Sequence, residues 1–456
     1  MLNNLQTYAE KLITQHNIPA ISLAIWRNGE LSEGAAGVLN LNTGVEANTD
    51  SIFQIGSITK VFTTSLVMKL VDDGRIDLDN PVKYYLRDFQ LADPRAASGI
   101  TVKQLLNHSS GIAGDYFPDD VNEDGPHIAR LVDRCSQLPL MHPVGDGFSY
   151  SNSAFAIAGR LIEVMSGMTW ADAMEEWIFQ PLGMSHAICR PADVLSFRAA
   201  LGHVPDSEDP GLMKACSGKH LSMGMAPAGT TPTMTARDVV AFARAHMEGG
   251  VSHSGERWLS EDSVKLMQKP TVDIPRTSKA VSTKMGLGWM LDTFQVGQLS
   301  CIQHGGATNG QCSMLRIFPE QNACFVILLN SRKPGVLPAI SNEISELITE
   351  VDLKLENANP VIKLSQDELL PYLGSYRCHG GDYEVELGEN GLVGVYKDAV
   401  DEEDQLVVTL YPLGDDCFEF KDEQSISLGV VRFMKPDDQG RYTRLMAFMR
   451  MHLRVG

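Results

Sequence analysis

GSITK, residues 56–60, opens a helical pattern and contains the one Ser-x-x-Lys tetrapeptide of the sequence. Apolar residues follow it at four-residue intervals, which is typical of a helix with one buried face, at Phe62, Leu66 and Leu70. Positions i and i+3 lie on the same face of a helix, so Ser57 and Lys60 are predicted to meet within its first turn. The stretch indicates either a nucleophile beside its base or a plain helix start that is followed by a lysine.

The first of these interpretations makes specific chemical demands. A serine attacks a carbonyl carbon when a base takes its proton, and Lys60 is such a base only when burial or a neighbouring positive charge lowers its pKa. Unpaired N–H groups at a helix N-terminus would favour the anion that forms in the attack. A chain of this length contains roughly one or two such tetrapeptides by chance, so the motif alone leaves both interpretations open.

Composition excludes several classes of function. The 456 residues carry a formal charge of −19, which disfavours nucleic-acid phosphates and anionic membrane surfaces as partners. The eight cysteines are dispersed without a C-x-x-C pair, and no histidine cluster has the spacing of zinc ligands. We expect free thiols, no metal and no cofactor.

The N-terminal sequence bears on localisation. MLNNLQTYAEKLITQ, residues 1–15, has the pattern of an amphipathic helix and lacks the basic start and apolar core of a signal peptide. No uninterrupted apolar run in the sequence approaches 18 residues. A cytoplasmic protein is expected, while a periplasmic or secreted one stays open.

Strand patterns lie at both ends of a helical middle. An Asn28-Gly29 hairpin signal separates two apolar stretches near the start, and further strands are predicted between residues 286 and 330. We therefore predict an α/β (α+β) domain over residues 1–352, in which an antiparallel sheet from about 1–56 and 286–352 packs against a helical part at about 57–285. A linker is expected at 353–365. Short alternating strands over 366–456 predict a separate all-β barrel or sandwich.

Two further motifs follow GSITK in order. Tyr150-Ser151-Asn152 lies 93 residues after Ser57, and His304-Gly305-Gly306 lies 154 residues after Tyr150. With Ser-x-x-Lys, they resemble the three motifs of the serine β-lactamase and penicillin-binding-protein superfamily, in its class C and D-aminopeptidase branch. The stretches 100–111, 226–229 and 286–289 are similar to other phrases of that family, so the resemblance covers about residues 5–350. Leu373-Gly-Ser-Tyr-Arg377 is similar to the start of the lipocalin-like barrel that follows some of its catalytic domains.

The resemblance implies a role for each motif residue. Ser57 would be the nucleophile that forms an acyl-enzyme, while Lys60 and Tyr150 would move protons, with the choice of general base left open. Tyr150 would need its phenol pKa lowered by neighbours. Substrate would be bound by Asn152, His304 and Gly306, and the backbone N–H groups of Ser57 and Ala307 would form the oxyanion hole. Without the resemblance, each motif residue has an ordinary interpretation: Tyr150 as a rim residue, Asn152 as a helix cap and His304 as a histidine at a sheet edge. His108 and Asp115 are expected to be structural.

The third motif departs from the β-lactamase pattern. Many β-lactamases and carboxypeptidases have Lys, then Thr or Ser, then Gly there, whereas His304-Gly305-Gly306 lacks the hydroxyl and is expected to carry a weaker, pH-dependent charge. Penicillin hydrolysis is therefore expected to be inefficient, and the histidine form resembles the D-aminopeptidases and related peptidases.

The leading hypothesis is a serine hydrolase that cleaves amide bonds of small peptides or amino-acid amides. An esterase, a residual β-lactamase and a non-catalytic sensor are the alternatives. The sequence has no G-x-S-x-G, no H-E-x-x-H and no phosphate-binding G-x-x-x-x-G-K-[ST]. The predicted partner is a small molecule or short peptide, and the barrel would either narrow the mouth of the site or build a homo-oligomer.

Overall fold

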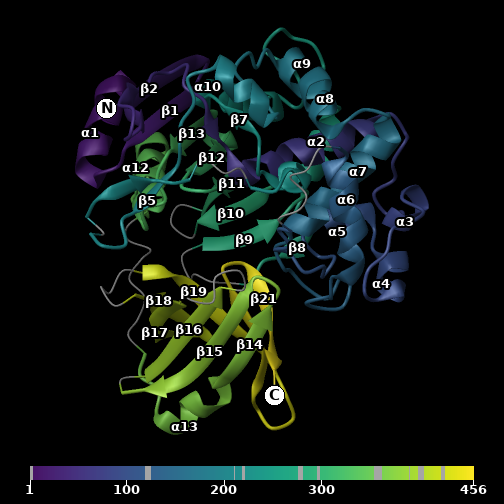
Figure 1. Cartoon of the computed structure of the whole chain (residues 1–456), viewed down its shortest axis with the longest axis vertical. Helices are drawn as coiled ribbons and strands as arrows, with labels where there is room; N and C mark the ends of the chain where they lie inside the picture. The colour runs from purple at the N-terminus through teal and green to yellow at the C-terminus, as the bar shows by residue number, and fades with distance from the viewer. Residues whose placement is uncertain are drawn as a thin grey trace.

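The structure, a computed structural model, describes residues 4–118, 125–209, 211–217, 221–275, 281–294, 298–353, 362–389, 391–398, 405–422 and 427–455. It combines a large sheet, covered by helices on both faces, with a closed β-barrel (Figure 1). This is the mixed architecture that the sequence predicts. The exact domain boundaries stay a prediction, and most of the linker expected at 353–365 lies outside the described residues.

The two ends of the first part build one sheet. Its nine strands lie in the order β3-β2-β1-β13-β12-β11-β10-β9-β8, and their pairings are antiparallel. The early and late strands meet where β1 pairs with β13, so that Ile21 lies opposite Leu329. The strands are β1 (Ala20–Arg27), β2 (Glu30–Asn40), β3 (Val45–Glu46), β8 (Val272–Asp273), β9 (Val281–Met285), β10 (Met290–Phe294), β11 (Leu299–Ala307), β12 (Cys312–Phe318) and β13 (Ala323–Leu329).

The hairpin between β1 and β2 forms where the sequence predicts it. Asn28 and Gly29 have φ of 53° and 93°, as the two central residues of a type I′ turn require. The pairing of Arg27 with Glu30 leaves these two residues as the turn. The turn fixes the register of both strands, which places the apolar residues of β1 on either face of the sheet.

Helices cover the two faces differently. α1 (Leu5–His16) and α12 (Val336–Thr349) share one apolar cluster with one face, while α10 (Ala236–Met247) packs on the other. Next to α10 is α2 (Thr59–Asp72), which is buried on nearly all sides, as expected for a helix in the middle of a large core.

The remaining helices form the helical part beside α2 (Figure 1). The short pairs β4 (Phe53–Gln54) with β7 (Thr233–Met234) and β5 (His203–Pro205) with β6 (Met213–Ala215) connect it to the sheet region. The helices are α3 (Val82–Tyr85), α4 (Pro94–Gly99), α5 (Val102–Leu106), α6 (His127–Arg134), α7 (Asn152–Ser166), α8 (Trp170–Met174), α9 (Gln180–Leu182) and α11 (Glu261–Met267).

The second part is a closed eight-stranded barrel that follows α13 (Gln366–Leu369). Its first and last strands pair, which closes the barrel. Aromatic side chains such as Tyr376, Tyr383 and Phe433 fill its interior, as is usual for a barrel of this size. The strands are β14 (Gly374–Cys378), β15 (Gly381–Gly388), β16 (Gly391–Asp398), β17 (Gln405–Gly414), β18 (Cys417–Lys421), β19 (Ser427–Pro436), β20 (Tyr442–Ala447) and β21 (Arg450–Val455).

The turn between β20 and β21 joins the barrel to the first part. Phe448 and Met449 form this turn with φ of 48° and 65°. The Tyr150 N–H donates to Met449 O at 2.9 Å, and the Met451 N–H donates to Ser149 Oγ at 3.2 Å. The barrel hairpin, residues 447–451, therefore lies against the loop that carries the Tyr150 motif.

Among the residues that the structure describes, no helix has the length and apolar character needed to cross a bilayer.

Candidate active site

Ser57 lies on a tight turn next to the end of β11. This 3₁₀ turn, η2 (Gly56–Ile58), leads into α2, which begins two residues later than the sequence pattern suggests. A Cβ atom on Gly56, whose φ is 54°, would lie 2.5 Å from Ala307 N, and one on Gly306 would lie 2.0 Å from Ile55 O. Only glycine permits such close approach. The two glycines thus bring the Ser57 and Ala307 backbones together.

Lys60 is buried directly behind Ser57. Its Nζ atom lies 3.0 Å from Ser57 Oγ and donates to Ala228 O at 2.7 Å. The side chain is 0% exposed. Burial, helped by the charge of Arg450, lowers the pKa of Lys60 well below its ordinary value of 10.5. The amine therefore becomes neutral at a lower pH than an exposed lysine does.

Tyr150 is a buried phenol in its neutral form. Burial raises the pKa of Tyr150, although the Ser57 hydroxyl and the charge of Arg450 oppose the rise. The lowered phenol pKa expected from the sequence is therefore wrong. The Tyr150 hydroxyl has no hydrogen-bond partner within the described part of the chain. Its proton is therefore available for donation to a group in the cavity.

His108 holds the Tyr150 ring from behind. The two rings stack with centroids 4.2 Å apart, and His108 Nδ1 accepts the Ser151 N–H at 3.0 Å. Because burial lowers the pKa of His108 well below 6.5, its imidazole is neutral. The residue supports the Tyr150 loop, in keeping with the structural role expected for it.

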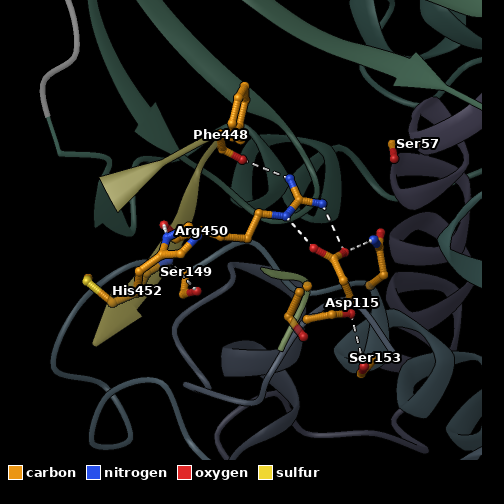
Figure 2. A network of polar contacts seen from close by, with 12 residues as sticks. Ser57, Asp115, Ser149, Ser153, Phe448, Arg450 and His452 are labelled. Carbon is orange, nitrogen blue, oxygen red and sulfur yellow. Dashed lines mark hydrogen bonds and ion pairs between the residues drawn. The ribbon is translucent and has the colours of Figure 1, made fainter. Parts of the chain in front are cut away.

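Asn152 belongs to an ionic cluster that the sequence does not reveal, whose ion pair between Asp115 and Arg450 is shown in Figure 2. Its Nδ2 donates to Asp115 Oδ1 at 2.7 Å, and Arg450 of the barrel donates to both oxygens of Asp115. Burial acts to raise the pKa of the Asp115 carboxyl, but Arg450 and Asn152 outweigh it and hold the pKa below its usual value. Asp115 is thus an ionised group of the site rather than a remote structural residue.

His304 is a neutral acceptor. Its Nδ1 lies 2.6 Å from Gly305 O. Because a carbonyl oxygen only accepts, the ring proton is on Nδ1. The buried Nε2 then has a free lone pair and no partner within the described residues. Burial, and then Lys60, lower the pKa of His304 to about 3. The pH-dependent charge expected at this position is therefore wrong, because the ring stays uncharged at any ordinary pH.

One cavity of about 720 Å³ connects these groups. The first part lines it with Ser57, Asp115, Tyr150, Asn152, His304, Gly306 and Ala307, and Lys60 lies behind Ser57. The barrel completes the wall with Cys378, Tyr396, Phe448, Met449, Arg450 and His452. All predicted site residues thus come together where the first part and the barrel meet.

Comparison with known proteins identifies the family. A family model described as Beta-lactamase matches residues 5–346. The chain belongs to the beta-lactamase family. This beta-lactamase family member is 36% identical over 376 residues to "Penicillin-binding protein 4" of Amycolatopsis lactamdurans, with 82% of this chain and 96% of that protein covered.

Solved structures agree with this assignment. SurE matches with a TM-score of 0.75 and 26% identity over 99% of both chains, so the likeness includes the barrel. D-amino acid amidase from Ochrobactrum anthropi SV3 matches 77% of this chain and 98% of its own with a TM-score of 0.60. At 23% identity, that second likeness shows the beta-lactamase fold alone.

Sequence reasoning missed Arg450 in this beta-lactamase family member. The residue lies 335 positions from Asp115, in a strand of the other part, and belongs to none of the three motifs. The sequence also predicts a structural role for Asp115, outside the site. The only general signal is that a buried arginine usually pairs with a carboxylate. The sequence does not tell which arginine is buried.

Proposed function

We propose that the protein hydrolyses amide bonds of small peptides or amino-acid amides through an acyl-enzyme on Ser57. The observation that carries this proposal is the 3.0 Å contact between Ser57 Oγ and Lys60 Nζ, in a setting where burial lowers the pKa of the lysine. A neutral amine at hydrogen-bond distance from a serine hydroxyl is an activated nucleophile with its base.

Lys60 is the better candidate for the base in the resting enzyme. It takes the Ser57 proton as Oγ attacks the carbonyl carbon, and the N–H groups of Ser57 and Ala307 receive the oxyanion. Tyr150, whose pKa is raised by burial, starts with its proton. The phenol gives this proton to the departing nitrogen and regains one from the Lys60 ammonium. Water then enters, gives a proton to Lys60 and attacks the carbonyl carbon of the ester. Lys60 passes this proton to Ser57 Oγ as the bond to the acyl group breaks, which releases the carboxylic acid and restores the enzyme.

The pH profile of kcat/KM should show the lowered pKa of Lys60. The base works only when neutral, so activity is lost as the pH falls through its pKa. Since burial and Arg450 lower that pKa, the acid limb is expected well below 10.5. Rates measured from about pH 5 to about pH 10 check this, and a limb centred near 10.5 would contradict a buried lysine base.

Gly56 offers a matched test of the turn that carries Ser57. Alanine at Gly56 would place Cβ 2.5 Å from Ala307 N, whereas at Gly74, whose φ of 68° is similar, it would meet nothing within 4 Å. Both substitutions cost roughly 1–2 kcal/mol of backbone strain, but only Gly56→Ala displaces the turn. We expect it to lower kcat/KM roughly a hundredfold and Gly74→Ala to change thermal stability alone. Equal kcat/KM in the two variants would show that the close approach has no catalytic value.

Several features support a short amide substrate. The cavity is closed on one side by the barrel, and a related structure is described as SurE with D-Leu, at 25% identity. The shared scaffold also includes a D-amino acid amidase. His304, being neutral, supplies no charge for the carboxylate of a penicillin from the position where many β-lactamases have a lysine.

The test is a panel of substrates with Ser57→Ala as the blank. Initial rates are measured on D-alanine and L-alanine p-nitroanilides, p-nitrophenyl butyrate and a chromogenic cephalosporin. Anilide turnover that vanishes in the variant supports the proposal and shows the stereochemical preference. Turnover of the ester alone, or of the cephalosporin alone, would replace the amidase by an esterase or a β-lactamase, and rates equal to the blank on every substrate would overturn hydrolysis of this kind.

A further inference from the structure

Arg450 uses only part of its hydrogen-bonding capacity. Its Nε and Nη2 donate to Asp115 at 2.8 and 3.0 Å, and its Nη1 donates to Phe448 O at 2.9 Å. A guanidinium has five N–H groups in a fixed plane, so two of them, one on Nη1 and one on Nη2, have no partner among the residues that the structure describes. These two form the third edge of the guanidinium.

The third edge faces the cavity. Figure 2 shows it on the side of the guanidinium that looks toward Ser57, and both residues line the same cavity. The Arg450 side chain is 27% exposed, although Asp115 holds it from below. Two parallel N–H donors in one plane match the two oxygens of a carboxylate. The two hydrogen bonds to Asp115 fix the orientation of the Arg450 guanidinium before a ligand binds.

The charge of the cavity favours an anion. Its charged lining residues, within the described part of the chain, are Asp115, Arg332 and Arg450, which leave a net positive charge in a protein whose formal charge is −19. His304 and His452 add nothing at neutral pH, because burial lowers their pKa values to about 3 and about 4.

A substrate ammonium finds less support in the same cavity. The one carboxylate among the described lining residues, Asp115, already accepts from Arg450 and Asn152. A free α-amino group would therefore have to displace one of them. An acylated amino group avoids this competition for Asp115, so N-acylated peptides are the cleaner probes of an anion site in this cavity.

We propose that Arg450 determines specificity by binding a carboxylate of the substrate on its free Nη1–Nη2 edge. The inference rests on the proposed function for its choice of substrate, a short peptide whose amide bond is cleaved. The carboxylate is either the free carboxyl terminus of the leaving part or an acidic side chain of the acyl part. The barrel thereby supplies the charged group that the His304-Gly305-Gly306 motif lacks, and the substrate-binding site is incomplete without it.

Binding to Ser57→Ala protein tests this without turnover. Calorimetry compares N-acetyl-D-leucyl-glycine with its carboxamide, and N-acetyl-D-glutamyl-glycinamide with the glutaminyl analogue. In at least one pair the acid is expected to bind about tenfold more tightly, the value of one charge-assisted bidentate contact. The pair that shows the preference tells which part of the substrate carries the carboxylate. Equal affinities in both pairs, or no binding of either acid, would overturn the proposal.

Variants locate the preference on Arg450. Arg450→Gln in the Ser57→Ala background should bring the acid-to-amide ratio of affinities close to one, whereas Arg332→Gln, which removes the other lining arginine, should retain it. Arg450→Gln leaves the Asp115 charge unpaired, so the double variant Asp115→Asn/Arg450→Gln keeps the test valid if the single variant fails to fold. A ratio that survives in either Arg450 variant would overturn the assignment.

The outcomes separate this inference from the proposed function. An Arg450-dependent preference for the acid, in a protein that hydrolyses none of the amides, would retain the carboxylate site and overturn the amidase. Ser57-dependent hydrolysis of acid and carboxamide with equal kcat/KM would retain the amidase and overturn the carboxylate site.

Discussion

Replacement of Ser57 by alanine is expected to lower kcat for amide hydrolysis on the order of 10⁶-fold. The substitution removes the oxygen that attacks the carbonyl and leaves the rest of the cavity in place. The measurement is single-turnover kinetics together with intact-mass spectrometry after reaction with a fluorophosphonate, which should add mass to the wild-type protein and none to the variant. Thermal melting should change little, because the Ser57 hydroxyl is not part of the apolar core.

A matched control for this variant lies in α2, the helix that follows the Ser57 turn. Ser65 is fully buried, and its hydroxyl donates to Val61 O at 2.9 Å. Ser65→Ala is expected to retain both the covalent label and the activity. Labelling that persists in Ser57→Ala, or that disappears in Ser65→Ala, would show that the nucleophile is a different residue.

Lys60→Met is expected to lower the rate of acylation by about 10³-fold or more. Methionine fills a similar volume without a base, so the Ser57 proton has no acceptor during attack. Ala228 O also loses its donor, which costs roughly 1–3 kcal/mol of stability. Stopped-flow measurement of acylation by an activated ester, set beside the free energy of unfolding, separates the catalytic loss from the structural one.

Lys69→Met provides the comparison on the same helix. Lys69 Nζ also donates to a backbone carbonyl, Trp258 O, at 2.9 Å, but it lies on no wall of the cavity. Its removal should cost a similar amount of stability without the loss of acylation. If Lys60→Met acylates at a rate near that of Lys69→Met, the base would have to be Tyr150.

The parts of the site that the sequence predicted are those that local patterns determine. Ser57 and Lys60 are three residues apart on one helical turn, and His304 and Gly306 lie at the end of a strand. Their identities were therefore available as short motifs. The sheet was also predicted, because the apolar runs that form β1 and β13 are long enough to indicate buried strands at both ends of the first part.

Charge states were not predictable in the same way. Tyr150 and His304 have the pKa values that burial imposes, and burial depends on packing between distant segments rather than on neighbours in the sequence. The same reason hides Arg450. Nothing in the run Phe448-Met-Arg450 indicates that its hairpin docks beside Tyr150, since that contact depends on how a complete barrel lies against another domain.

The docking of the barrel hairpin also affects when the enzyme becomes competent during synthesis. Ribosomes add roughly 5–20 residues per second, so Ser57 would be translated tens of seconds before Arg450. The pairing of β1 with β13 imposes a similar delay, since the sheet cannot be assembled until its late strands have emerged. A nascent chain thus carries Ser57 long before the cavity wall that contains Arg450 is made, and the selectivity proposed for Arg450 is absent until that hairpin has been added.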